Sequence, residues 1–246
     1  MNSAIVITRV AERHWHALED DRVVGRGEAS PRPDGRLFLS IDSWHGTVFD
    51  QLAGVMLAEL PTPLYTVVDE ADRDLTSHWQ RTGFTTRRRE WEYDVPTGVH
   101  SVPQPAGVTI VPVGEADEGP LRELDREIRA EVEASVGWLS MPAEVLPHPA
   151  GAPSKHAAAV AGHRYVGLVR VTGRPRSPRI GLIAVRAEEQ RRGIARALLA
   201  DVLGRLHGKG IDTASADVNE ANHAAVALFE GFGARRASSN LELVLR

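Results

Sequence analysis

The sequence predicts an α/β protein of two domains, each built on a β-sheet with helices on its faces. Apolar residues alternate between strand and helix periodicity along the chain, which is the pattern of such sheets. The length of 246 residues corresponds to one or two domains of about 150 residues. The stretch "PTGVHSVPQPAG" is rich in proline and glycine and has no apolar period. We therefore expect domains at 1–96 and 108–246, joined by a linker at 97–107.

Composition excludes several classes of function. The net charge of −4 provides no overall field that would attract nucleic acid or an anionic membrane. The chain has no cysteine, which excludes disulfides, thiolate zinc sites and a cysteine nucleophile. Neither a signal peptide nor an apolar run of about 18 residues is found. We expect a soluble, cytoplasmic protein without a metal site.

The N-terminal region shows alternating strand and helix patterns. Val48, Leu52 and Leu60 recur at helical spacing within the longest apolar segment. The predicted elements are a strand at 4–10, a hairpin at 15–29 turning at Asp20-Asp21, a strand at 37–42, a helix at 47–60, a strand at 63–69 and a helix at 71–84. The "RRR" run at 87–89 is interpreted as a solvated edge strand, with contact to RNA or phosphate as the alternative.

The C-terminal region continues the same alternation. Leu121, Leu124 and Ile128 define one helical face, and Ile194 and Leu198 begin another. The predicted elements are a strand at 107–113, a helix at 120–133, an irregular stretch or short helix at 136–146, two strands at 155–171, a strand at 179–185, a helix at 191–207, a strand at 211–218, a helix at 222–233, and a strand or hairpin at 234–246.

The two regions resemble each other, which indicates a weak internal repeat. Both end in a helix, a bulky aromatic residue, a glycine and an arginine-rich strand. Three pairs of positions match in this alignment: Gly83 with Gly233, Trp79 with Phe229, and Asp72 with Asn222.

The junction "AVRAEEQRRGIARALL" predicts an anion site. A helix that starts near Gly193 leaves backbone N–H groups without partners at the positive end of its dipole. Such a helix start suits phosphate. The small residues Gly193 and Ala195 allow close approach, and Arg191, Arg192 and Arg196 add charged donors at the rim. The alternative is a tight turn with a solvated arginine cluster.

This junction resembles the Gln/Arg-x-x-Gly-x-Gly/Ala acetyl-CoA signature of the GCN5-related N-acetyltransferases (GNAT family). "DVNEANHAAVALFEGFG" resembles a later motif of the same family, and the resemblance covers residues 108–246. It implies a mixed, mostly antiparallel sheet flanked by helices. It also implies that the N-terminal region is a degenerate copy, because "DSWHGTVFDQLAG" lacks the signature. Tandem arrangements of this kind resemble mycothiol synthases.

The resemblance implies a set of binding residues. Ile183, Ala184 and Val185 would pair with the pantetheine arm as an added strand does. The Val185 N–H would also polarise the thioester carbonyl. Asn222 would bond the cofactor and Phe229 would line its thiol end, with a helix N-cap as the alternative for Asn222. The diphosphate would lie on the amides of Arg191, Arg192, Gly193, Ile194, Ala195 and Arg196.

The resemblance implies a general base but leaves the general acid unassigned. Asp217 lies where related N-terminal acetyltransferases carry a glutamate base, and its alternative is a solvated strand residue. Phe229 occupies a position where the family often has a tyrosine acid. Substitutes for this acid are a water, Tyr165, His163 or His223. Glu131 and Glu133 are interpreted as a solvated helix face, with attraction of a cationic amine as the alternative.

We therefore expect an N-acetyltransferase that moves the acetyl group of acetyl-CoA, its co-substrate, to a primary amine by direct attack in a ternary complex. The acceptor would be a small molecule or a peptide. No nucleic acid or membrane partner is expected, and the protein would be a monomer or homodimer. The alternative is a catalytically weak acyl-CoA-binding sensor or scaffold.

Overall fold

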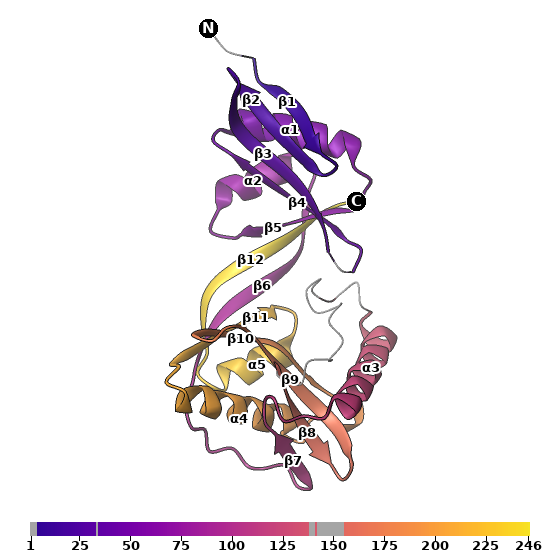
Figure 1. Ribbon diagram of the computed structural model, residues 1–246, viewed down its shortest axis with the longest axis vertical. Helices are drawn as coiled ribbons and strands as arrows, with labels where there is room; N and C mark the ends of the chain where they lie inside the picture. The colour runs from indigo at the N-terminus through magenta and orange to yellow at the C-terminus, as the bar shows by residue number, and fades with distance from the viewer. Residues whose placement is uncertain (1–3, 33, 138–140, 142–154) are drawn as a thin grey trace. The chain divides into compact units, whose positions relative to one another are not determined.

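The computed structural model describes residues 4–32, 34–137, 141 and 155–246, which form two compact units (Figure 1). Unit 1 comprises Met1–Glu90 and Ser238–Arg246, and unit 2 comprises Trp91–Ala237. The end of the chain thus returns to the first unit. The expected domains at 1–96 and 108–246 remain a prediction about which segments fold independently.

Unit 1 is a sheet with two helices. Its strand order is β1–β2–β3–β4–β5–β12–β6. Helices α1 and α2 bury their apolar residues in one core with the sheet, centred on Trp15, Phe49, Met56 and Trp79. The elements are β1 (Val6–Ala11), β2 (His14–Glu19), β3 (Arg22–Pro31), β4 (Leu37–Ser43), α1 (Gly46–Glu59), β5 (Leu64–Asp69), α2 (Arg73–Arg81), β6 (Thr85–Pro96, to Glu90 in this unit) and β12 (Arg235–Leu245, from Ser238 in this unit).

The predicted hairpin turn is confirmed. Asp20 and Asp21 have φ angles of 47° and 60° between β2 and β3. Two successive residues with positive φ define the turn that suits the twist of a two-residue hairpin, and aspartate tolerates this conformation better than most residues.

The interpretation of the "RRR" run is wrong. Arg87 and Arg88 form ion pairs with Glu242, which is 3% exposed, and Arg89 forms one with Glu70 at 2.6 Å. Arg36 also pairs with Glu242, at 3.3 Å. Arg87 and Arg88 therefore belong to a buried charge cluster inside unit 1, and Arg89 belongs to a separate, partly exposed ion pair. The partners of the run could not be seen in the sequence, because Glu242 is far away along the chain.

Unit 2 is a sheet with helices on both faces, as predicted. Its strand order is β7–β8–β9–β10–β11–β6, with β12 beyond β6. The elements are β7 (Val108–Val111), α3 (Glu118–Ser135), β8 (His156–Ala161), β9 (Arg164–Arg174), β10 (Ser177–Val185), a 3-10 helix (Ala187–Glu189), α4 (Ile194–Gly208), β11 (Thr213–Asn219) and α5 (His223–Glu230), together with Trp91–Pro96 of β6 and Arg235–Ala237 of β12.

The two faces of this sheet carry separate cores. On one face, α3 packs Leu121, Leu124 and Ile128 against Leu168 of β9. On the other face, α4 and α5 share a larger core that includes Leu198. Most of the segment expected at 136–146 lies outside the described residues. Among the described residues, no helix has the length and apolar content needed to cross a membrane.

The structure supports the internal repeat. In each unit the fourth and fifth strands in sheet order form a parallel pair, β4 with β5 and β10 with β11. The aligned residues Asp72 and Asn222 each cap a helix, accepting a backbone N–H three residues ahead. Gly83 and Gly233 both have positive φ. The expected C-terminal strand or hairpin is a single strand, β12.

Candidate functional site

A left-handed turn lies between the 3-10 helix and α4. Arg191 and Gly193 have φ angles of 65° and 81°, a conformation that favours glycine. Helix α4 therefore begins at Ile194 rather than at Arg191, where the apolar pattern predicted it. Ile194 is 1% exposed and anchors the helix start in the core of unit 2.

The first turn of α4 is open toward its N-terminus. Ala197 donates its amide proton to the Gly193 carbonyl, and none of the described side chains caps the helix. The amides that precede Ala197 thus have no acceptor within the helix. A Cβ atom at Gly193 would meet no heavy atom of the described residues within 4 Å. Unpaired N–H groups, the positive end of the dipole and free space together suit an anion such as a diphosphate.

The corresponding helix of unit 1 begins differently. The residue before α1, His45, has extended backbone with φ of −141° instead of a left-handed turn. A Cβ atom at Gly46 would lie only 2.5 Å from Cε1 of His78, so an imidazole covers this helix start. His78 in turn contacts Asp50 at 3.4 Å. Unit 1 therefore offers no open amide turn at α1.

The three arginines near Gly193 are engaged to different degrees. Arg192 forms an ion pair with Glu189 and donates to the Ala106 carbonyl at 3.0 Å. The Arg196 guanidinium lies over the Phe232 ring, 5.4 Å from its centroid. Within the described part of the chain, Arg191 has no hydrogen-bond or ion-pair partner and is exposed. Arg191 is thus the most available of the three for an incoming anion.

Strands β10 and β11 separate just before the turn. They pair in parallel at Arg179 with Ser215 and at Ile180 with Ala216. The ladder between β10 and β9 shifts register between Ile180 and Leu182, which marks a bulge. Beyond the bulge the β9 ladder continues to the end of β10. β11 therefore no longer pairs with one edge of this segment of β10.

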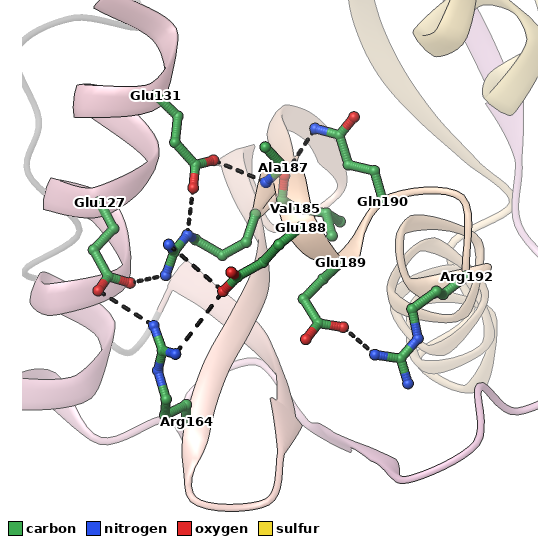
Figure 2. A network of polar contacts seen from close by, with 10 residues as sticks. Glu127, Glu131, Arg164, Val185, Ala187, Glu188, Glu189, Gln190 and Arg192 are labelled. Atoms are coloured by element: carbon green, nitrogen blue, oxygen red, sulfur yellow. Dashed lines mark hydrogen bonds and ion pairs between the residues drawn. The ribbon is translucent and has the colours of Figure 1, made fainter. Parts of the chain in front are cut away.

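The backbone of Ile183 and Val185 points to that edge. Arg186 donates its N–H to the Val166 carbonyl of β9 at 2.9 Å. Because backbone groups of alternate residues point to opposite edges of a strand, Val185 and Ile183 present theirs away from β9. Gln190 Nε2 donates to the Val185 carbonyl at 3.2 Å (Figure 2). This edge thus presents the backbone N–H and C=O groups that an extended ligand needs for strand-like hydrogen bonds.

A network of charges connects α3 to the turn (Figure 2). Glu131 accepts hydrogen bonds from Arg186 Nε at 2.6 Å and from the Ala187 N–H at 2.9 Å. Glu127 pairs with both Arg186 and Arg164. The Glu131 hydrogen bond is the main cause that raises the pKa of Arg186.

The interpretation of Glu131 as a solvated residue was incomplete. Its side chain is half-buried, and its carboxylate holds the chain directly after β10 instead of standing free to attract an amine. The i, i+4 spacing of Glu127 and Glu131 was the available signal, because it places both carboxylates on one side of the helix.

Asn222 and Phe229 belong to α5. The Asn222 side chain accepts the Ala225 N–H at 3.1 Å, so the N-cap interpretation is confirmed. The Phe229 ring is 5% exposed and stacks on Tyr93, with 6.2 Å between centroids. The Tyr93 hydroxyl donates to Glu230, and burial raises the pKa of Tyr93. The contacts of Asn222 and Phe229 with a cofactor stay predictions.

Asp217 lies on β11 beside the bulge. Its carboxylate forms an ion pair with Arg179 through Oδ2. Continuing the β10–β11 register from Arg179 and Ser215 places Asp217 next to Gly181. The side chain is therefore close to the point where the two strands separate, but it is not an isolated carboxylate.

The structure does not bring the three candidate general acids, Tyr165, His163 and His223, together beside Asp217. The Tyr165 hydroxyl accepts the Asp117 N–H at 2.9 Å and so helps to start α3. His163 is an exposed turn residue between β8 and β9, and His223 is exposed at the start of α5. The described residues therefore assign no general acid.

Comparisons with known proteins agree with this geometry. Residues 143–242 match the family model described as an acetyltransferase (GNAT) domain. No curated protein matches the sequence. The matched segment includes α4, α5 and strands β8 to β11, and so contains the turn at Gly193.

Solved structures share the fold across both units. A GCN5-related N-acetyltransferase from Sphaerobacter thermophilus has a TM-score of 0.67 at 17% identity, covering 97% of this chain and 82% of that one. A tandem GNAT protein from the clavulanic acid biosynthesis pathway has a TM-score of 0.63 at 17% identity, covering 94% and 82%. An acetyltransferase from the GNAT family of Colwellia psychrerythraea has a TM-score of 0.61 at 13% identity, covering 95% and 85%.

Proposed function

We propose that unit 2 binds acetyl-CoA and transfers its acetyl group to a primary amine, and that unit 1 has no cofactor site of its own. The observation that carries this proposal is the open left-handed turn at Gly193, a few residues after the segment of β10 that no longer pairs with β11. The family match adds acyl transfer as the general class of activity.

The two features suit different parts of the same ligand. The amides from Arg191 to Arg196 would hold the diphosphate, as anions are held at helix N-termini. The outward backbone groups of Ile183 and Val185 would pair with the amides of the pantetheine arm. The Gln190 side chain, which now bonds the Val185 carbonyl, would have to give way to such pairing.

Two groups would serve the chemistry. The Val185 N–H would donate to the oxygen of the tetrahedral intermediate, where such a donor contributes about 3–4 kcal/mol. Asp217 would accept the proton of the attacking amine, directly or through a water. Among the described residues, Arg179 is the only ion-pair partner of Asp217 and uses Oδ2. This leaves Oδ1 for the amine or the water.

The departing sulfur needs no acid from Phe229. A thiol has an ordinary pKa of about 8.5, so a thiolate is a tolerable leaving group near neutral pH. A sensor or scaffold that binds acyl-CoA without turnover is the alternative that the missing acid favours.

Release of the free thiol separates the two functions. The full chain is incubated with acetyl-CoA and a panel of primary amines, and cofactor binding is measured by calorimetry. We expect one cofactor bound per chain and amine-dependent thiol release. Binding without release for any amine favours the sensor, and more than one cofactor per chain contradicts the role assigned to unit 1.

Replacing Asp217 with asparagine is expected to lower turnover about a hundredfold, since loss of a general base costs about 10²–10⁴ in rate. The affinity for acetyl-CoA should change little. Turnover is measured by thiol release and affinity by calorimetry.

Arg179→Met is the matched control, because it breaks the same ion pair and leaves the carboxylate. If Asp217 is the base, this variant keeps most of its activity. Equal losses in the two variants would show that Asp217 only pairs with Arg179.

A further inference from the structure

Arg170 is a buried arginine in the middle of β9. It is 9% exposed, and its Nε atom has no hydrogen-bond partner among the described residues. A buried donor without a partner costs free energy, and native proteins rarely keep one without a reason. This residue had no role in the expectations drawn from the sequence.

The guanidinium lies over the bulge of β10. A Cβ atom at Gly181 would come within 3.3 Å of Arg170 Nε and 3.5 Å of its Nη2. Gly181 stands where β10 separates from β11, next to the position of Asp217. Arg170 therefore points at the part of the sheet where the proposed transfer takes place.

The described charges around Arg170 do not balance. Asp125 of α3 pairs with Arg129 at 2.6 Å, and Asp217 pairs with Arg179. Both carboxylates thus already have an arginine, and Arg170 adds a further positive charge. Burial lowers the pKa of Arg170, and Arg129 and Arg179 lower it further, whereas Asp125 opposes them.

We propose that Arg170 binds an oxyanion of the acceptor, a carboxylate or a phosphate, so that the substrate is an amine that also carries an anionic group. This inference rests on the proposed acyl transfer. An arginine suits this task because its fork of N–H donors matches a carboxylate or phosphate oxygen pair.

The location favours the acceptor over the cofactor. Leu168, two residues before Arg170 on the same face of β9, packs against α3, whereas α4 covers the opposite face. A diphosphate on the first turn of α4 is therefore on the other side of the sheet. An amine that attacks through the gap between β10 and β11 has to approach from the α3 side, where Arg170 lies.

The first test needs no knowledge of the acceptor. We expect Arg170→Met to raise the melting temperature of the full chain without ligand, by about 2–4 °C, because it removes an unpaired buried charge. The matched control is Arg174→Met, which changes an exposed arginine at the end of the same strand and should leave melting unchanged. A lower melting temperature for Arg170→Met would show a structural role and overturn the proposal.

The second test measures anion binding directly. Melting is followed with coenzyme A at saturation, so that the turn at Gly193 is filled, while acetate or phosphate replaces chloride at constant ionic strength. The wild type and Arg174→Met should be stabilised, and Arg170→Met should not. Stabilisation by acetate alone identifies a carboxylate site and by phosphate alone a phosphate site. Equal responses in all three proteins contradict the proposal.

Matched acceptors complete the test. Thiol release is compared for β-alanine and its amide, and for phosphoethanolamine and ethanolamine. The wild type should prefer the anionic member of a pair, and Arg170→Met should lose at least about thirtyfold in kcat/KM for that member only. A preference for the neutral member overturns the role of Arg170. Absence of turnover with every amine, despite cofactor binding, contradicts the proposed function and leaves the melting tests to decide on Arg170.

Discussion

Replacing Gly193 with glutamate is expected to lower the affinity for coenzyme A more than a hundredfold. The new carboxylate would stand at the positive end of the α4 dipole, where the diphosphate is expected. Each charge-assisted hydrogen bond that the diphosphate loses costs about 1.5–3 kcal/mol, so two of them account for the factor. Calorimetric titration of the full chain with coenzyme A measures the loss.

Gly210→Glu is the matched control. Gly210 follows the other end of α4, has a φ of 72° and, like Gly193, has no heavy atom within 4 Å of its ideal Cβ position. Both substitutions strain a left-handed residue, so both should lower stability to a similar extent. Only Gly193→Glu should lose the ligand, and equal affinities in the two variants would place the diphosphate elsewhere.

Replacing Glu242 with glutamine is expected to destabilise unit 1 by about 3–5 kcal/mol. Glu242 is 3% exposed and pairs with Arg36 at 3.3 Å and with Arg88 at 3.0 Å. Removing the acidic partner of buried arginines leaves uncompensated charge, which is far more costly than the loss of a surface pair. Within the part of the chain that the structure describes, Arg88 Nε and Nη1 already lack a hydrogen-bond partner.

Urea unfolding of the full chain, followed by far-UV circular dichroism, checks this prediction. Glu28→Gln serves as the control, because Glu28 is exposed on β3 of the same unit and should change stability by less than about 0.5 kcal/mol. A small effect of Glu242→Gln would mean that the arginines find other partners or water.

Local patterns predicted the elements well, and for a physical reason. Helix and strand periods reflect which residues face a core, and this information lies within each segment. The boundary of α4 was less accurate, because the apolar pattern extends to Arg191 whereas the left-handed turn delays the helix to Ile194. The return of Ser238–Arg246 to unit 1 could not be predicted, since strand order depends on contacts between distant segments.

The candidate site likewise has features that a local motif could predict and features that depend on distant residues. The glycine turn and the strand before it are contiguous in sequence, so a motif could identify them. Other contacts that shape the helix starts come from residues distant in sequence. Glu131 of α3 binds the Ala187 N–H, and His78 covers the start of α1. Arg170 stands within an apolar strand pattern, and only the fold shows that it lies over Gly181.

A crystal structure of the full chain with acetyl-CoA tests the central claim most directly. We predict diphosphate oxygens within hydrogen-bond distance of the backbone N–H groups between Arg191 and Arg196, and the pantetheine arm along Ile183 and Val185. A diphosphate bound at any other position, including the start of α1, would contradict the account.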